Sequence, residues 1–174
     1  MNDILNQMKT RRSCRHFLEK PVPAELLDEI AQAGLYAASG RNLQSPIILQ
    51  ITDPALIGKL YRMNAAAAGR ESGNPFYGAP ALFVVLADRS AASTYLYDGS
   101  LVLGNMMLAA HALGLGSCWI HRAKEEFESE EGKEILKSFD IEGDYEGIGH
   151  LIVGYSADPL PPPPERRKGR LFVR

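Results

Sequence analysis

The hydrophobic and polar positions of this chain follow two different periods along its length. Apolar residues at helical spacing are typical of amphipathic helices, and apolar or β-branched runs bounded by Pro, Gly or Asp are typical of strands. By these criteria, helices are expected in residues 4–10, 20–39, 54–69, 95–113 and 123–139. Strands are expected in residues 47–52, 79–88, 113–120 and 145–156. Helices at the start, with strands threaded among later helices, predict an α+β or mixed α/β fold.

Two of the expected helices have unusual faces. The helix over 95–113 is apolar almost all round, which predicts burial either at the centre of the domain or against a second subunit. The helix over 123–139 is strongly acidic, and its charges are expected to face water.

The last part of the chain departs from this pattern. Residues 158–174 contain the run Pro161–Pro164, which favours an extended polyproline II conformation, then a basic segment and a strand-like "LFVR". A compact domain does not need such an arm for its own fold. An arm of this kind is suited to reach across a partner subunit. We therefore expect a domain in residues 1–157 and an arm in residues 158–174.

Composition limits the class of protein. With 174 residues, 45% of them hydrophobic and 23% charged, the chain has the composition of a single globular domain. Its net charge of −2 argues against general binding to nucleic acid or to a membrane surface. The two cysteines, Cys14 and Cys118, have neither CxxC spacing nor a His/Cys cluster, which argues against a disulfide scaffold or a metal site. A charged N-terminus without an apolar core region predicts a cytoplasmic protein without a signal peptide.

Positive charge is nevertheless concentrated at two places. Arg11, Arg12, Ser13 and Arg15 combine guanidinium groups with a hydroxyl within five residues, which suits a phosphate. A second basic cluster lies in residues 165–170, and the two could meet at one dianion. The alternative is that both clusters are solvated surface charge. A basic stripe interleaved with aromatic residues, typical of nucleic-acid binding, is missing.

Five segments in order resemble the nitroreductase family of FMN-dependent oxidoreductases. They are "RRSCRHF" at 11–17, "AASGRNLQSP" at 37–46, "GNPFYGAP" at 73–80, "GLGSCWI" at 114–120 and "VGY" at 153–155. The resemblance covers nearly the whole chain. It implies an α+β fold with a mixed sheet flanked by helices, and an intertwined homodimer whose C-terminal arm crosses to the partner.

The resemblance also implies a function. An enzyme of this type uses FMN to pass electrons from NAD(P)H to a small-molecule acceptor such as a nitroaromatic or a quinone, by a ping-pong mechanism. Because the flavin carries the redox chemistry, no catalytic side chain is expected. The alternatives are an FMN-dependent oxidase or dehydrogenase of a specific metabolite, and a non-catalytic flavin-binding protein.

Residue roles follow from the same resemblance. The FMN phosphate and ribityl chain fall to Arg11, Arg12 and Ser13, and the pyrimidine end of the flavin to Arg15. The partner subunit is expected to supply Ser39, Asn42 and Gln44, and Asn74 to contact the ring edge. The segment that contains Cys118, Trp119, His121 and Arg122 is expected to lie along the N5 side of the flavin. Arg167 or Lys168 is expected to contact the FMN phosphate from the C-terminal arm. Phe76 and Tyr77 are candidates for the substrate face.

The chain departs from the family after the third expected strand. Family members often carry glutamate and glycine there, where this chain has His121 and Arg122. A bulky cationic pair at this place could narrow the site or favour an acidic substrate. From its neighbours, Cys118 is expected to be a buried packing residue as well.

Overall fold

The computed structural model describes residues 3–70 and 72–174. Its helices are α1 (Asp3–Thr10), α2 (Ala24–Leu35), the short 3-10 helix η1 (Gly40–Asn42), α3 (Pro54–Ala67), α4 (Tyr95–Ala112), α5 (Ala123–Glu128) and α6 (Glu130–Ser138). Its strands are β1 (Pro46–Ile51), β2 (Ala81–Asp88), β3 (Gly116–Ile120) and β4 (Tyr145–Gly154).

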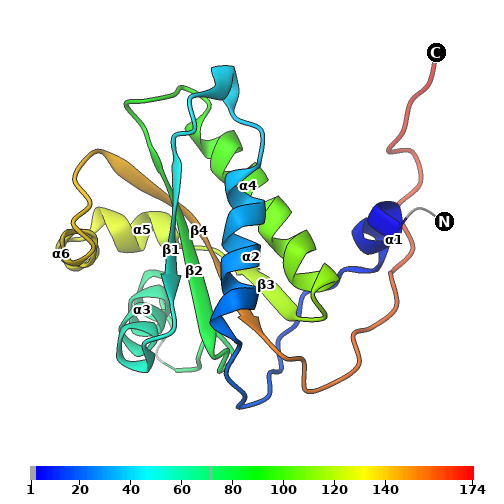
Figure 1. The fold of residues 1–174 in the computed structure, drawn as a ribbon, viewed down its shortest axis with the longest axis horizontal. Coiled ribbons are helices and arrows are strands. Elements are labelled where there is room, and N and C mark those ends of the chain that lie inside the picture. Colours follow the sequence, from blue (N-terminus) through cyan, green and yellow to red (C-terminus); the bar gives the residue numbers. More distant parts are fainter. Residues whose placement is uncertain (1–2, 71) are drawn as a thin grey trace.

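The strands form one sheet between two layers of helices. Its order is β1-β2-β4-β3, and each neighbouring pair runs antiparallel. Helices α2 and α4 cover one face, and α3, α5 and α6 cover the other (Figure 1). The predicted α+β fold with a sheet flanked by helices is confirmed. The resemblance implied a mixed sheet, but the pairs of named strands are antiparallel. A parallel pairing occurs in the isolated bridge between Ser13 and Ser117.

The central strands β2 and β4 are buried on both faces because each face carries a helical layer. On β2, Val84 packs into the cluster shared with α3, α5 and α6, while Phe83 and Val85 pack against α2 and α4. A strand covered on both sides has no polar face to alternate with its apolar one. This explains why "ALFVVLAD" is apolar nearly throughout and was recognisable in the sequence.

Helix α4 lies along the sheet, and its own chain does not bury it on all sides as its apolar sequence predicted. Leu103 and Met106 are buried against the sheet, whereas Tyr97 and Leu101 are exposed. The helix ends where Gly114 adopts a φ of +75°, a left-handed conformation that glycine adopts without a side-chain clash. The turn leads directly into β3.

The acidic segment differs from its prediction in two ways. Instead of one helix over 123–139, the chain forms α5 and α6, separated at Ser129, which has an extended conformation. The Ser129 hydroxyl accepts a hydrogen bond from Gly132 N at 3.1 Å and so caps α6. The charges do not all face water, because Glu126 is buried in the core between α3 and β4.

The arm leaves the end of β4 and passes beside α1 (Figure 1). Within the described chain, residues 158–174 form no helix or strand, so the strand expected from "LFVR" is absent here. Leu171, Phe172 and Val173 are almost fully exposed. Across the described residues, none of the helices is both long enough and apolar enough to traverse a bilayer.

Candidate cofactor site

The N-terminal arginine segment is fixed to the edge of the sheet. Residues 11–17 follow α1 as extended chain, and Ser13 forms a parallel bridge with Ser117 at the start of β3. Cys14 N donates to Ser117 O at 2.9 Å, and the Cys14 thiol lies in the core. The backbone therefore anchors this segment, and the arginines on either side of Cys14 can project outward.

The start of the arm is attached to the same segment. Ala157 N donates to His16 O at 2.9 Å, and Phe17 forms an antiparallel bridge with Ser156. His16 Nδ1 also lies 2.7 Å from Asp158 Oδ2. These contacts direct the prolines of the arm over the arginines of the N-terminal segment.

The two segments enclose a cavity of about 440 Å³, here called the arginine cavity. It is lined by Arg11, Arg12, Ser13, Arg15, prolines of the arm and Arg166. No acidic side chain of the described residues lines it. Arginines gathered without a carboxylate repel one another, which is unfavourable unless an anion occupies the space between them.

Electrostatics and hydrogen bonding in the arginine cavity support this interpretation. The pKa of Arg12 is lowered from its ordinary value, first by loss of water and then by the positive charges of Arg166 and Arg11. Within the described part of the chain, Arg11 Nη1 and Arg12 Nε are buried donors without a hydrogen-bond acceptor. Arg12 Nη1 and Nη2 already donate to Arg11 O and Lys9 O, so Arg11 Nη1 and Arg12 Nε are the donors left for a phosphate to satisfy. The residues present therefore fit a phosphate group.

Arg166 was missed by the sequence reasoning, which assigned this position to Arg167 or Lys168. The path of the arm turns Arg166 into the arginine cavity, whereas Arg167 and Lys168 do not line it and are exposed. Three consecutive basic residues give no local signal for which one points inward. Arg166 is thus the residue of this cluster that lines the arginine cavity, and the assignment of the phosphate to Arg167 or Lys168 stays a prediction.

A second cavity of about 360 Å³ begins where the first ends. This β3 cavity is lined by Arg15, Arg70, Tyr77 and the segment 118–122 at the end of β3, with Asn64 at its wall. Arg15 lines both cavities. A ligand with an anionic tail and a flat ring could therefore extend from one cavity into the other.

The segment after β3 is held from behind by buried polar groups. Asn64 Nδ2, on α3, donates to His121 O at 2.6 Å and to Glu126 Oε1 at 2.5 Å. Arg122 adopts a φ of +84°, an uncommon conformation for a residue with a side chain, and its guanidinium bonds Glu125 Oε1 at 2.6 Å. The strained turn thus presents a fixed backbone to the β3 cavity.

Trp119 has a defined place beside this turn, because it packs over Gly149 of β4. A Cβ atom at Gly149 would lie 2.6 Å from Trp119 Nε1, so only glycine fits below the indole ring. Cys118 is buried in the core cluster, as expected for a packing residue, and also borders the β3 cavity.

Ser39, Asn42 and Gln44 lie elsewhere in the chain, around η1. Gly40 N bonds Asp98 near the start of α4, while Thr10 meets His111 near its end. With a rise of 1.5 Å per residue, these two points are about 20 Å apart. A single chain therefore does not bring these three residues to the arginine cavity.

The backbone around η1 is itself unusual. Arg41, Asn42 and Gln44 have φ values of +54°, +58° and +50°. Ser39 Oγ accepts from Gln44 N at 3.1 Å, and Gln44 Nε2 donates to Asn42 Oδ1 at 3.0 Å. Such a cluster of left-handed residues is costly and is frequent at binding sites.

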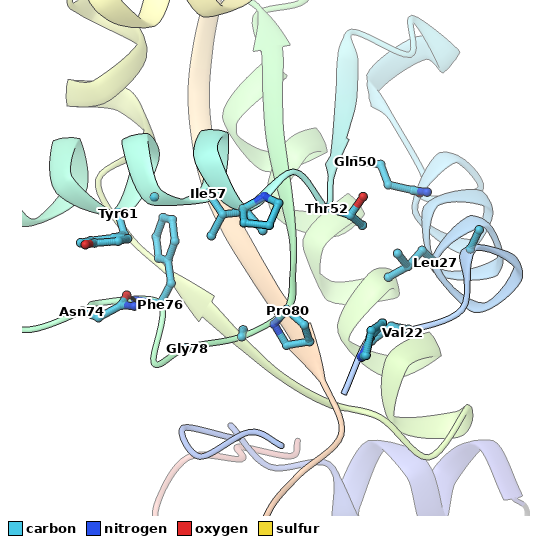
Figure 2. A pocket seen from close by; sticks show the side chains of 15 residues that line it. Val22, Leu27, Gln50, Thr52, Ile57, Tyr61, Asn74, Phe76, Gly78 and Pro80 are labelled. Carbon is cyan, nitrogen blue, oxygen red and sulfur yellow. Dashed lines mark hydrogen bonds between the residues drawn. The ribbon is translucent and has the colours of Figure 1, made fainter. Parts of the chain in front are cut away.

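The segment 74–77 is divided between two cavities. Asn74 and Phe76 line a larger, mainly apolar cavity of about 540 Å³ between α2, α3 and the loop before β2, where Figure 2 shows Asn74 beside Phe76. Asn74 Oδ1 accepts from Phe76 N at 2.8 Å, and the Phe76 ring is buried against His150. Tyr77 instead lines the β3 cavity and is partly exposed. Of the two candidates for the substrate face, only Tyr77 lies at the β3 cavity.

Comparison with known proteins agrees with the motifs. The nitroreductase family model matches residues 8–75 and 67–155, which together span most of the chain. The chain belongs to the nitroreductase family.

Individual relatives extend the comparison. A putative NADH dehydrogenase/NAD(P)H nitroreductase of Archaeoglobus fulgidus is 31% identical over 125 residues, covering 69% of this chain and 68% of that protein. Its counterpart in Methanothermobacter thermautotrophicus is 29% identical over 67% of this chain, and the match spans 60% of that protein's length. The crystal structure of a nitroreductase with bound FMN from Bacteroides fragilis is 26% identical, with a TM-score of 0.90 over 100% of both chains. A second one with bound FMN, from Desulfitobacterium hafniense, has a TM-score of 0.88 at 26% identity over 100% of both chains.

Proposed function

We propose that this chain is an FMN-dependent oxidoreductase that transfers electrons from NAD(P)H to a nitroaromatic, quinone or similar acceptor. The observation that carries the proposal is the pair of cavities joined at Arg15, one with unpaired guanidinium donors and one with aromatic walls. Together they have the polarity of a phosphorylated flavin, anionic at one end and flat at the other. The FMN named in two similar structures supports this choice of ligand.

In this proposal, each basic residue has a defined task. Arg11, Arg12 and Arg166 hold the phosphate with charge-assisted hydrogen bonds, and the Ser13 hydroxyl adds a donor. Arg15 lies at the pyrimidine end of the ring, where its positive charge stabilises the negative charge gained on reduction. The positive charge that balances the phosphate is therefore local to the site. This explains an arginine cluster in a chain whose overall charge is −2.

The turn after β3 orients the reactive edge of the ring. When bound, FMN supplies the hydride and electron chemistry, so the chain needs no catalytic acid or nucleophile. The backbone of 118–122, held by Asn64 through His121 O, presents its polar groups to the ring from one side. Asn74 lines the larger cavity and not the β3 cavity, and its Oδ1 accepts from Phe76 N, so its side chain would have to turn for its amide to reach the ring edge.

A homodimer completes the site in this proposal. Ser39, Asn42 and Gln44 would come from the second subunit, because within one chain they lie at the far end of α4. Apolar surface for an interface is available, since Met8 on α1 is 54% exposed and Leu101 on α4 is 51% exposed. We assign residues 158–174 the role of an arm that crosses to the partner, where exposed Phe172 would find a contact.

The deciding experiment is the visible spectrum of the purified protein, followed by anaerobic addition of NADH or NADPH. A yellow protein whose flavin band is bleached rapidly by either nucleotide supports the proposal. A yellow protein that neither nucleotide reduces would favour the metabolite oxidase or the non-catalytic flavin protein. A colourless protein that does not take up FMN would refute the proposal.

The order of the two half-reactions gives a second test. We propose that donor and acceptor use the same face of the cofactor in turn, because a flavin ring lodged in the β3 cavity would leave one open face to an entering ligand. Ping-pong kinetics, with parallel double-reciprocal lines, are then expected. Intersecting lines would show a ternary complex and contradict this order.

A further inference from the structure

The β3 cavity is unusually basic for a cavity with aromatic walls. Arg15, Arg70, His121 and Arg122 line it together with Tyr77 and Trp119, and no acidic side chain of the described residues does. The chain as a whole has a net charge of −2, so this concentration is local. Under the proposed function, Arg15 is engaged by the flavin, which leaves Arg70, His121 and Arg122 toward the entering ligand.

Arg122 is held by a partner that it can exchange. Its guanidinium bonds Glu125 Oε1 at 2.6 Å, and the two side chains are 42% and 39% exposed. An ion pair with this exposure contributes little net free energy, so a carboxylate on a ligand can compete with Glu125 for the guanidinium. Glu125 itself does not line the cavity. The pair therefore offsets the charge of Arg122 in the free enzyme, through a contact that a ligand carboxylate can replace.

Arg70 approaches from a different element. It follows α3, and its backbone N donates to Ala65 O at 2.9 Å, which closes the end of that helix. Among the described residues its side chain forms no ion pair. The cavity thus has cationic groups on two separate segments, with aromatic surface for a ring from Tyr77.

We propose that the acceptor reduced at this site is an aromatic anion, a ring that carries a carboxylate or sulfonate group, with Arg122 and Arg70 as the residues that select it. This inference rests on the proposed function and makes its acceptor specific. A bidentate guanidinium contact favours a planar carboxylate, and the ring of the same ligand lies against Tyr77.

The test compares two acceptors that differ in charge but hardly in shape, 4-nitrobenzoate and 4-nitrobenzamide, at a fixed saturating concentration of the nucleotide. The measured quantity is the ratio of their kcat/KM values in each variant. Because the two nitro groups differ in intrinsic reactivity, only the change of this ratio relative to the unmodified enzyme is interpreted. Fixing the donor also separates the acceptor's charge from the phosphates of NAD(P)H.

Two substitutions should move the ratio in opposite directions. Arg122→Gln should lower the preference for 4-nitrobenzoate roughly tenfold, the effect of one charge-assisted contact. Glu125→Gln should raise it several-fold, since Arg122 is then free for the ligand. Arg70→Gln should lower it as Arg122→Gln does. Arg62→Gln is the matched control, because Arg62 lies on α3 near the site but does not line the β3 cavity.

Binding without turnover gives an independent measurement. Trp119 is the only tryptophan of the chain, and it borders the cavity while its indole packs over Gly149, so quenching of its fluorescence reports a ligand held nearby. Stronger quenching by 4-nitrobenzoate than by 4-nitrobenzamide, lost in Arg122→Gln, is expected. If both acceptors turn over and the ratio is the same in Arg122→Gln, Arg70→Gln and Glu125→Gln, the acceptor inference is wrong and the proposed function stands. If neither acceptor turns over, the proposed function fails. Equal quenching by the two ligands overturns the acceptor inference.

Discussion

Glu126 and His150 face each other inside the core, with Glu126 Oε2 3.2 Å from His150 Nε2 and both side chains fully shielded from water. The two atoms are close but not aligned as a hydrogen bond. The other carboxylate oxygen accepts from Asn64, whose amide also holds His121 O. A helix of the acidic segment is thereby connected to β4, to α3 and to the turn at the β3 cavity.

Removal of the Glu126 carboxylate should therefore destabilise the fold strongly. Glu126→Ala removes one of the two acceptors of the buried Asn64 amide and the carboxylate that faces His150, and loss of a buried polar partner costs about 1–3 kcal/mol. The free energy of unfolding from urea denaturation measures the loss.

Glu128→Ala is the matched control on the same helix. Glu128 pairs with Arg89 at 3.6 Å and with Lys124 at 3.9 Å, but it is 44% exposed. Its substitution should cost less than about 1 kcal/mol. Equal losses for the two variants would mean that the buried contact contributes no more than a surface pair.

The elements that were predictable from the sequence are those whose pattern is local. "ALFVVLAD" is apolar on both sides of the strand, and residues 95–112 have the length and composition of one helix, so both were recognised. The break at Ser129 was missed because it depends on packing. Gly132 lies so close to the preceding turn that a Cβ there would be 2.2 Å from Glu126 O. A capping serine followed by acidic residues was the available local signal.

The site shows the same division between local and long-range information. The arginine segment is contiguous in the sequence and was predicted as an anion-binding motif. Arg166 was recognised only as a member of the second basic cluster, because its position at the cavity depends on contacts such as that between His16 and Asp158, which direct the arm. Asn64 was also missed, since a lone asparagine in an alanine-rich helix gives no sign that its amide reaches His121 O.

Loss of a single arginine should weaken the binding of FMN through its phosphate. Arg12→Ala removes a guanidinium that lines the arginine cavity and should cost about 1.5–3 kcal/mol of binding free energy. Titration of the apoprotein, followed by quenching of flavin fluorescence, gives the dissociation constant.

Riboflavin, which lacks the phosphate, is the control ligand for this variant. Its affinity should change little, because Arg12 lines the arginine cavity and not the β3 cavity. A parallel loss for FMN and riboflavin would show that Arg12 acts on the fold and not on a bound anion.

Arg166 and Arg167 are neighbours that should behave differently. Arg166→Gln should reduce FMN affinity by about tenfold, because Arg166 lines the arginine cavity. Arg167→Gln removes the same charge one residue further along, outside the cavity, and should leave affinity within about twofold at moderate salt. The same fluorescence titration compares the two. The reverse order would restore the assignment that the sequence alone suggested.

Disruption of the proposed subunit interface should remove the flavin without a change at the flavin's own residues. Leu101→Asp places a charge on the exposed face of α4 and should yield monomers that carry little FMN. Light scattering after size-exclusion chromatography gives the mass, and the visible spectrum gives the flavin content. Phe139→Asp is the control, because Phe139 is 38% exposed at the end of α6, on the other side of the sheet (Figure 1). A monomeric Leu101→Asp variant that retains FMN would exclude a site shared between subunits.

His111 offers a reporter of the anion in the arginine cavity. The Thr10 hydroxyl donates to Asn6 O at 2.9 Å, so His111 Nε2 must donate to Thr10 Oγ1, also at 2.9 Å. The pKa of His111 is lowered from its ordinary value, first by burial and then by the positive charges of Arg11 and Arg12. The unfolded chain therefore binds the proton more readily, and stability should decrease as the pH falls below about 6.5, the pKa of an unperturbed histidine.

A bound dianion should reverse the part of this shift that the arginines cause. Sulfate is a suitable probe because, unlike phosphate, it does not titrate between pH 5 and 8. With sulfate bound, the pKa of His111 should rise, and by linkage sulfate should bind more tightly as the pH falls through that range. Ring-proton NMR titrations with and without sulfate measure the pKa, with His111→Gln to assign the resonance. Arg12→Ala should raise the pKa of His111 without sulfate, because it removes one of the repelling charges. A His111 pKa that responds to neither sulfate nor Arg12→Ala would mean that no anion is held beside these arginines.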